Sequence, residues 1–189
     1  MRIRRRPGAG HVVGKMPAGS RYSNRPIVAW VTRRADRRRF GKVPVPYASR
    51  NRRGWIDLHG VHVTRSRIRV VAVLSRHLLE VERRGRVVLR FRAATGTPAT
   101  PTPPGRYFVT DRVPFYPGSE YGIFAFGISG IQTHLPPGWT GGNQLAIHGT
   151  NDPASIGTSA SAGCLRVSAH ALRRLEPLLR IGTPVVISP

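Results

Sequence analysis

Arg67-Ile-Arg-Val-Val-Ala-Val-Leu-Ser75 and Arg86-Val-Val-Leu-Arg-Phe-Arg92 decide the fold class of this chain. Both runs are rich in β-branched residues, and the second follows the turn signal Arg83-Arg-Gly85, so together they predict a β-hairpin. The chain has 21 glycines and 17 prolines among 189 residues, which break its apolar residues into short runs. This composition favours a mainly β fold with one or two short helices.

Further short apolar runs follow on the C-terminal side. We expect strands at residues 106–110, 121–127, 144–148 and 184–187, and a rigid loop at the proline-rich residues 100–105, because proline cannot donate to a sheet ladder. The helix signal starts at Ser168, a suitable N-cap, and continues through Leu172, Leu175 and Leu179. Pro177 interrupts this pattern, so we expect about two turns, a kink and an end at Gly182.

The N-terminal side differs in composition. Residues 1–26 are rich in Arg, Gly, Ser and Pro without periodicity, and we interpret them as a basic, disordered leader. Residues 27–66 hold β-type runs at 26–32, 41–45 and 54–58, and they predict a small β-rich segment similar to an SH3-like module. Residues 67–188 form the expected main domain. No apolar run is long enough to span a bilayer or to follow the basic start as an export signal does, so we expect neither signal nor anchor in this chain.

The net charge of +23 comes almost wholly from arginine. Residues 1–70 carry 19 basic and 2 acidic side chains, so most of the excess lies at the N-terminal side. Such a chain attracts polyanions. The runs Arg4-Arg-Arg6 and Arg37-Arg-Arg39 lack the interleaved aromatics or the recognition helix that would read a nucleic acid, so we do not favour that partner. Three other kinds of anionic partner stay open: acidic lipids, anionic wall polymers and peptidoglycan carboxylates.

Cys164 is the only cysteine, which excludes a disulfide framework and a cysteine-based metal site. A lone cysteine is ordinarily a small buried hydrophobe. This one follows Gly163 and lies sixteen residues after His148, across a Gly/Ser/Thr-rich loop. A nucleophilic thiol needs a base, oxyanion donors and access to substrate, and this segment can supply all three. The glycine permits a sharp turn that aims backbone N–H groups at one point.

Arg166 lies two residues after the thiol, where its guanidinium can pair with a substrate carboxylate. The other histidines show no spacing typical of a metal site, and we expect neither a metal nor a cofactor.

Three segments resemble the L,D-transpeptidase catalytic domain of the YkuD type: His148-Gly-Thr-Asn151, Ser161-Ala-Gly-Cys-Leu-Arg-Val167 and Gly182-Thr-Pro-Val-Val-Ile187. The upstream Thr95-Gly96 and Thr100-Pro-Thr-Pro-Pro-Gly105 are similar to the loop before that family's central strands. The resemblance covers roughly residues 67–188 and implies a β-sandwich-like domain. It also implies a cysteine that is acylated by a peptidoglycan stem tetrapeptide, with release of D-Ala. The acyl group would then pass to an amine, which makes a 3→3 cross-link, or to water.

By position, the resemblance assigns Cys164 as nucleophile and His148 as base, with Ser161, Gly163 and Gly149 in the surrounding motif. Arg166 is the expected substrate-binding residue, and two aromatic residues are candidates for lining the peptide groove, namely Tyr121 and Trp139.

Family members commonly have a histidine before the Gly-Cys pair, where this chain has Ala162. His134 and His170 are the residues that could replace that imidazole. The resemblance implies a bacterial protein that acts outside the membrane, in the periplasm or cell wall, and it leaves the oligomeric state open. Two alternatives remain: a weak or inactive wall-binding module of the same fold, and a basic nucleic-acid-binding protein.

Overall fold

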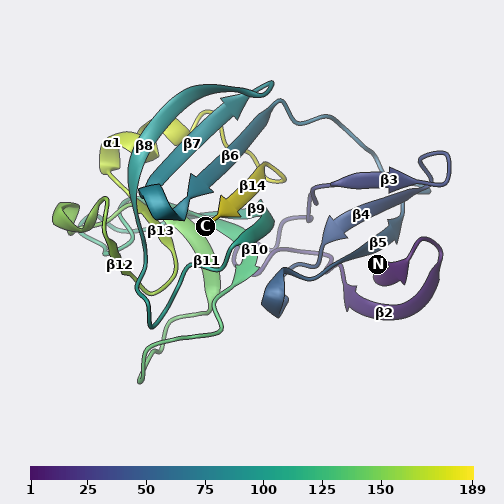
Figure 1. The fold of residues 1–189 in the computed structure, drawn as a ribbon, viewed down its shortest axis with the longest axis horizontal. Helices are drawn as coiled ribbons and strands as arrows, with labels where there is room; N and C mark the ends of the chain where they lie inside the picture. The colour runs from purple at the N-terminus through teal and green to yellow at the C-terminus, as the bar shows by residue number, and fades with distance from the viewer.

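The computed structural model describes all 189 residues, which form two β-sheets lying side by side (Figure 1). The larger sheet has nine strands in the order β12-β8-β13-β11-β10-β9-β14-β6-β7, and β7 also pairs with β8. This last pairing closes the sheet into a barrel-like form, so that its two halves face each other across one core. The predicted mainly β class is confirmed. None of the helices has the length and apolar character needed to cross a membrane.

The elements of the larger sheet are β6 (Ile68–Val73), β7 (Leu78–Arg83), β8 (Arg86–Gly96), β9 (Gly105–Pro114), β10 (Phe124–Ile131), β11 (Gln144–His148), β12 (Ser159–Ser161), β13 (Leu165–Val167) and β14 (Pro184–Ser188), with the single α-helix α1 (Ala169–Leu175) before the last strand.

The predicted hairpin contains a strand that the sequence pattern missed. β6 pairs with β7, not with β8, and the turn at Arg84-Gly85 joins β7 to β8. In β7, Leu79 and Val81 are fully buried, and they alternate with half-buried glutamates. Those glutamates pair with arginines of the neighbouring strands, because Arg69 Nη2 lies 2.5 Å from Glu82 and Arg90 Nε lies 2.7 Å from Glu80. The alternation is a strand pattern of period two.

Helix α1 begins as expected. The Ser168 hydroxyl accepts from the Ala171 N–H at 3.1 Å and so caps the helix. Leu172 and Leu175 are fully buried and belong to the 20-residue core that fills the barrel-like sheet. The helix ends at Leu175, before Pro177. This packing ties the segment just after Cys164 to the core.

Residues 1–26 are not a disordered leader. They contain β1 (Arg2–Arg6) and β2 (Ala9–Lys15), which join the five-stranded sheet β2-β1-β5-β4-β3 together with β3 (Arg33–Ala35), β4 (Phe40–Pro44) and β5 (Arg53–Asp57). Ile3 is fully buried in a second small core, while Arg2, Arg5 and Arg6 are exposed. The burial of Ile3 and the pairing of β1 with β5 therefore order a segment that its composition had predicted to be disordered.

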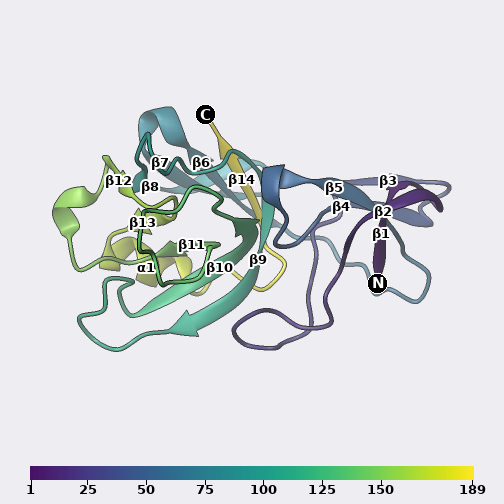
Figure 2. The same ribbon diagram turned by 90° about the horizontal axis from the view of Figure 1, so that it is seen from below.

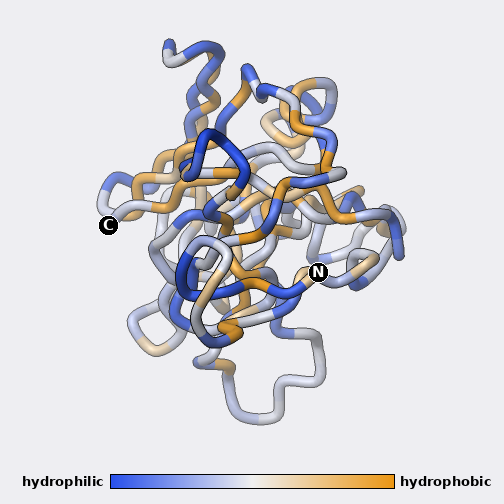
Figure 3. The backbone as a smooth tube through the Cα atoms, turned by 90° about the vertical axis from the view of Figure 1, so that its right-hand side faces the viewer, coloured by the Kyte–Doolittle hydropathy of each residue, from blue (hydrophilic) through white to orange (hydrophobic).

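The β-rich N-terminal unit thus starts at residue 2 and not at residue 27, and the run 26–32 forms no strand. Its likeness to an SH3-like module stays a prediction. In Figure 3, which views the molecule from this side, hydrophilic stretches alternate with short hydrophobic ones. Figure 2 shows the segment between β2 and β3 reaching from the N-terminal sheet toward β9 and β10.

Candidate active site

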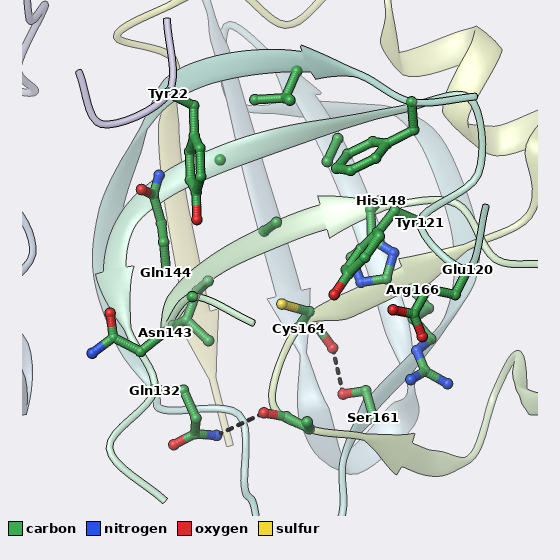
Figure 4. Close-up of a pocket in the computed structure, with 18 of the residues that line it drawn as sticks. Tyr22, Glu120, Tyr121, Gln132, Asn143, Gln144, His148, Ser161, Cys164 and Arg166 are labelled. Atoms are coloured by element: carbon green, nitrogen blue, oxygen red, sulfur yellow. Dashed lines mark hydrogen bonds between the residues drawn. The ribbon is translucent and has the colours of Figure 1, made fainter. Parts of the chain in front are cut away.

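A cavity of about 250 Å³ opens beside β11 and β13 and is lined by 20 residues (Figure 4). The residues that the sequence singled out and that line it are Tyr121, Trp139, His148, Ser161, Cys164 and Arg166, together with Ala162. The fold therefore brings together side chains from four separate parts of the chain.

The pairing of β11 with β13 puts Cys164 and His148 on one face. The two strands are parallel, with Ile147 opposite Leu165 and His148 opposite Arg166. Ile147 and Leu165 point into the core, each at most 1% exposed. Since successive side chains alternate between faces, His148, Arg166 and Cys164 point to the cavity side.

His148 is held in its neutral form. It is 3% exposed, and its Nδ1 lies 2.6 Å from the Gly149 carbonyl oxygen, which can only accept, so Nδ1 carries the proton and Nε2 is a free acceptor. Burial lowers the pKa of His148 to about 4, and the Arg166 charge acts in the same direction, against the Gly149 hydrogen bond. The Tyr121 ring lies edge-on at 5.0 Å and helps to fix the imidazole.

Cys164 is half-buried and lines the cavity. Burial raises the pKa of its thiol, and this effect outweighs a backbone hydrogen bond with Ala146 and the nearby Arg166 charge, both of which favour the thiolate. The resting pair is therefore a thiol beside a neutral imidazole. A thiol in this state can act as a nucleophile only if it loses its proton.

The turn that presents Cys164 is clamped by Ser161. The Ser161 hydroxyl donates to the Cys164 carbonyl at 2.6 Å and accepts from the Gly163 N–H at 3.0 Å. Gly163 has φ +111°, a conformation that side-chain-bearing residues rarely adopt, and a Cβ there would collide with the Gln132 amide. Because the Gly163 N–H is already bonded to Ser161, the contribution of Gly163 is the turn itself rather than an oxyanion donor.

Gln132 is a site residue that sequence reasoning missed. Its side-chain nitrogen donates to the carbonyls of Thr100 (3.3 Å), Pro101 (2.9 Å) and Ala162 (3.2 Å). Its side-chain oxygen accepts from the N–H groups of the next two residues. The residue is 2% exposed. It joins the proline-rich loop, the 132–143 loop and the Cys164 turn, and no local pattern marks a contact between segments 30 residues apart.

Gly149 supports the site from behind. A Cβ on it would lie 2.9 Å from the Gly122 Cα, so the two backbones approach too closely for any side chain. Its carbonyl orients His148. His134 and His170, which could have replaced the imidazole absent at Ala162, are exposed and do not line the cavity.

The rim carries one cation and several aromatics. Arg166 is half-buried, and its Nε is covered without a hydrogen-bond partner. Tyr121 stacks on Phe115 at 4.9 Å, and burial with the Glu120 charge raises the pKa of Tyr121 to about 12, so its hydroxyl stays protonated. Trp139 lies on an exposed loop that turns back through a 3.2 Å bond from its Nε1 to the Gly142 carbonyl.

The profile of the YkuD family, the L,D-transpeptidase catalytic domain, matches residues 67–187. The chain belongs to this family. The Bacillus licheniformis protein YkuD, provisionally assigned as an L,D-transpeptidase, is 31% identical over 121 residues, which cover 64% of this chain and 66% of the relative. The Bacillus subtilis protein of the same name is 31% identical over 103 residues, covering 54% and 55%. The chain thus spans about two thirds and just over half of the lengths of these relatives.

Solved structures show the same fold. L,D-transpeptidase 3 from Mycobacterium tuberculosis, in complex with a faropenem-derived adduct, superposes with a TM-score of 0.52 at 16% identity, covering 89% of this chain and 71% of that one. Bdellovibrio bacteriovorus Bd1075 gives a TM-score of 0.51 at 24% identity, covering 65% and 48%. At these identities the likeness concerns the fold alone.

Proposed function

We propose that this chain is an L,D-transpeptidase that acts on peptidoglycan stem tetrapeptides through a thioester on Cys164. The observation that carries the proposal is the placement of Cys164, His148 and Arg166 on one face of the β11–β13 pair, around a single cavity. Membership of the family supports the reaction type. The arrangement supplies a nucleophile, a neutral base and a cation for a substrate carboxylate.

In the first half-reaction the thiol sulfur attacks the carbonyl between the third-position diamino acid and the terminal D-Ala. The thiol proton passes to Nε2 of His148, which is free because Nδ1 bonds to Gly149. A C–S bond forms and the C–N bond breaks. The proton on His148 then goes to the departing D-Ala nitrogen, so the imidazole is neutral again at the thioester stage.

The negative charge that forms on the oxygen of the tetrahedral intermediate must be stabilised by hydrogen-bond donors. With the Gly163 N–H bonded to Ser161, we assign this role to the N–H of Cys164 in the same turn. Arg166 pairs with the carboxylate of the terminal D-Ala and draws the peptide end toward its side of the cavity.

In the second half-reaction an amine or water attacks the thioester carbonyl, and His148 takes the proton from the attacking group. The C–S bond then breaks, and the proton passes from His148 to the departing Cys164 sulfur. An amine acceptor gives a 3→3 cross-link, and water gives a tripeptide. Ala162 lines the cavity where many family members carry a histidine. The absence of that histidine favours one alternative to an active enzyme, namely a weak or inactive wall-binding module of the same fold.

The test is incubation with a disaccharide-tetrapeptide, followed by intact-protein and product mass analysis. We expect a thioester adduct on wild type, none on Cys164→Ala, and dimer or tripeptide product. A penem is the second probe, because the M. tuberculosis relative carries a faropenem-derived adduct. An adduct-free wild type with both reagents would refute the enzyme and leave the wall-binding module.

We further propose that the chain works outside the membrane, with its arginine-rich sheet attached to an anionic wall polymer. The support is the exposure of the arginines on β1 and β3 and in the turn after β3, namely Arg2, Arg5, Arg6, Arg33, Arg34, Arg37, Arg38 and Arg39. Cosedimentation with cell walls should fall steeply with salt and with removal of the anionic polymer. Retention on polymer-free walls, or equal competition by duplex DNA, would refute this attachment.

A further inference from the structure

A compact loop between β2 and β3 lies beside the cavity, and its Tyr22 is one of the lining residues. The loop, residues 19–26, is closed by the bridge between Gly19 and Pro26 and by a 2.9 Å bond from the Ser20 N–H to the Arg25 carbonyl. Within it, the Ser20 and Ser23 hydroxyls lie 2.7 Å apart. These bonds give the loop one conformation of its own.

Asp111 of β9 anchors this loop to the catalytic domain. Its Oδ1 accepts from the N–H groups of Tyr22 (3.3 Å) and Ser23 (3.0 Å) and from the Ser23 hydroxyl (3.0 Å). Asp111 is fully buried. Burial by itself raises the pKa of this carboxyl, but hydrogen bonds from residues including Ser20, Thr110 and Ser23 outweigh it and hold the pKa below its usual value. A buried carboxylate with these partners fixes the loop firmly.

Two further contacts hold the loop from the sides. Arg21 donates to the Asn143 side chain at 2.9 Å, and its guanidinium lies 4.3 Å from the centre of the Tyr47 ring. Tyr47 in turn donates its N–H to the Ser129 carbonyl at 2.8 Å. The loop is therefore tied to the segment after β4 and, through Tyr47 and Asn143, to the region of β10 and β11.

Because Asp111 holds the loop in this position, Tyr22 forms one wall of the cavity. Figure 4 shows its ring and the Arg166 guanidinium on opposite sides of Cys164. The Tyr22 backbone is bonded to the buried Asp111, but the residue is 57% exposed. Its ring is therefore accessible from the cavity and is not packed into the core. Leu135 and Trp139 line the same cavity and add apolar surface.

We infer that Tyr22 is a specificity-determining residue, whose ring packs on the acyl part of the stem peptide, the part that stays on Cys164 after D-Ala leaves. The inference rests on the proposed function. The scissile carbonyl must lie at the Cys164 sulfur, and Arg166 holds the leaving D-Ala carboxylate on its own side. The remainder of the peptide then extends to the opposite side, where Tyr22 lies. A rigid exposed aromatic suits an aliphatic peptide arm.

The test compares Tyr22→Ala with Tyr22→Phe and with Tyr116→Ala, an exposed tyrosine outside the cavity, all in the full chain. Two Michaelis constants are measured: that of the disaccharide-tetrapeptide for acylation, and that of isotope-labelled free D-Ala for exchange into the tetrapeptide. Exchange is the reverse of the first half-reaction, so it reports on the leaving-group side alone. Penem acylation and thermal unfolding check that each variant is folded and reactive.

For Tyr22→Ala we expect about a five- to tenfold rise in KM for the tetrapeptide, with KM for D-Ala unchanged. Tyr22→Phe and Tyr116→Ala should stay near wild type. An unchanged tetrapeptide KM, a rise confined to D-Ala, or an equal loss in Tyr22→Phe would each overturn ring packing on the acyl part. A wild type that never reacts with tetrapeptide would instead refute the proposed function, so the two failures are distinguishable.

Discussion

The Ser161 hydroxyl donates to the carbonyl of Cys164 at 2.6 Å while it accepts from the Gly163 N–H at 3.0 Å. Ser161, which is only 2% exposed, thus bonds to two backbone groups of the turn that holds Cys164. The thiol position depends on this clamp, because Cys164 itself precedes β13 and is not part of the strand ladder.

Replacing Ser161 by alanine should slow acylation of Cys164 by about 10- to 100-fold, because a displacement of about 1 Å at a reacting atom costs that much. The measurement is penem acylation followed by intact mass. Ser159→Ala, at an exposed position of the same short strand, is the control and should react at the wild-type rate. Equal rates in both variants would show that the turn holds without the clamp.

Gly163→Ala should abolish acylation and destabilise the fold by about 1–3 kcal/mol, through strain at φ +111° and collision with the Gln132 amide. Gly138→Ala is the matched control, because Gly138 also has positive φ (+72°) but open space around its Cβ position. Urea unfolding of both variants separates the two causes. A loss of stability no larger than that of Gly138→Ala would contradict the collision.

Gln132→Ala should lower the free energy of unfolding by about 1–3 kcal/mol, since it leaves the buried Thr100 carbonyl and the partly buried Pro101 and Ala162 carbonyls without their donor. Acylation should slow as well, because the Ala162 carbonyl adjoins the Cys164 turn. The neighbouring exposed His134→Ala should change stability by less than about 0.5 kcal/mol and leave acylation intact. Slowed acylation in His134→Ala would mean that this imidazole reaches the site after all.

The acid limb of the pH–rate profile for acylation should lie near pH 4. Burial disfavours the imidazolium form of His148 and lowers its pKa to about 4, so the base is already neutral at pH 5 and the rate stays flat toward neutrality. Measuring penem acylation from pH 3.5 to 8 tests this. A limb near pH 6.5, the usual imidazole value, would show that His148 is solvated in solution or is not the base.

The same pKa shift predicts acid sensitivity of the fold. The unfolded chain binds a proton at His148 near pH 6.5 and the folded chain only near pH 4, so stability is full above pH 6.5 and falls by about 3 kcal/mol as pH drops to 4. Denaturation of wild type and His148→Gln across this range gives the contribution as a difference. Parallel curves for the two proteins would argue against the shift.

Local sequence patterns predicted the structure correctly where a residue's contacts come from its own segment. The strand at 144–148, the final strand and the Ser168 cap follow from period and capping chemistry, and the structure has all three. The resemblance to a known family motif placed His148 and Cys164 in one site, and in the structure both line the same cavity. The same patterns failed at residues 78–83 and at 2–6, where arginines and glutamates mask a strand whose buried face holds only one or two apolar residues.

The sequence by itself determined the mainly β class and the single thiol, since these depend on composition, and its resemblance to a family motif pointed to His148. Only the tertiary structure decided which side chains surround them. Gln132 reaches the Cys164 turn across 30 residues, and Tyr22 reaches the cavity through Asp111, 89 residues away. Such contacts arise when a closed sheet and a second module bring distant segments together, and no local periodicity encodes them.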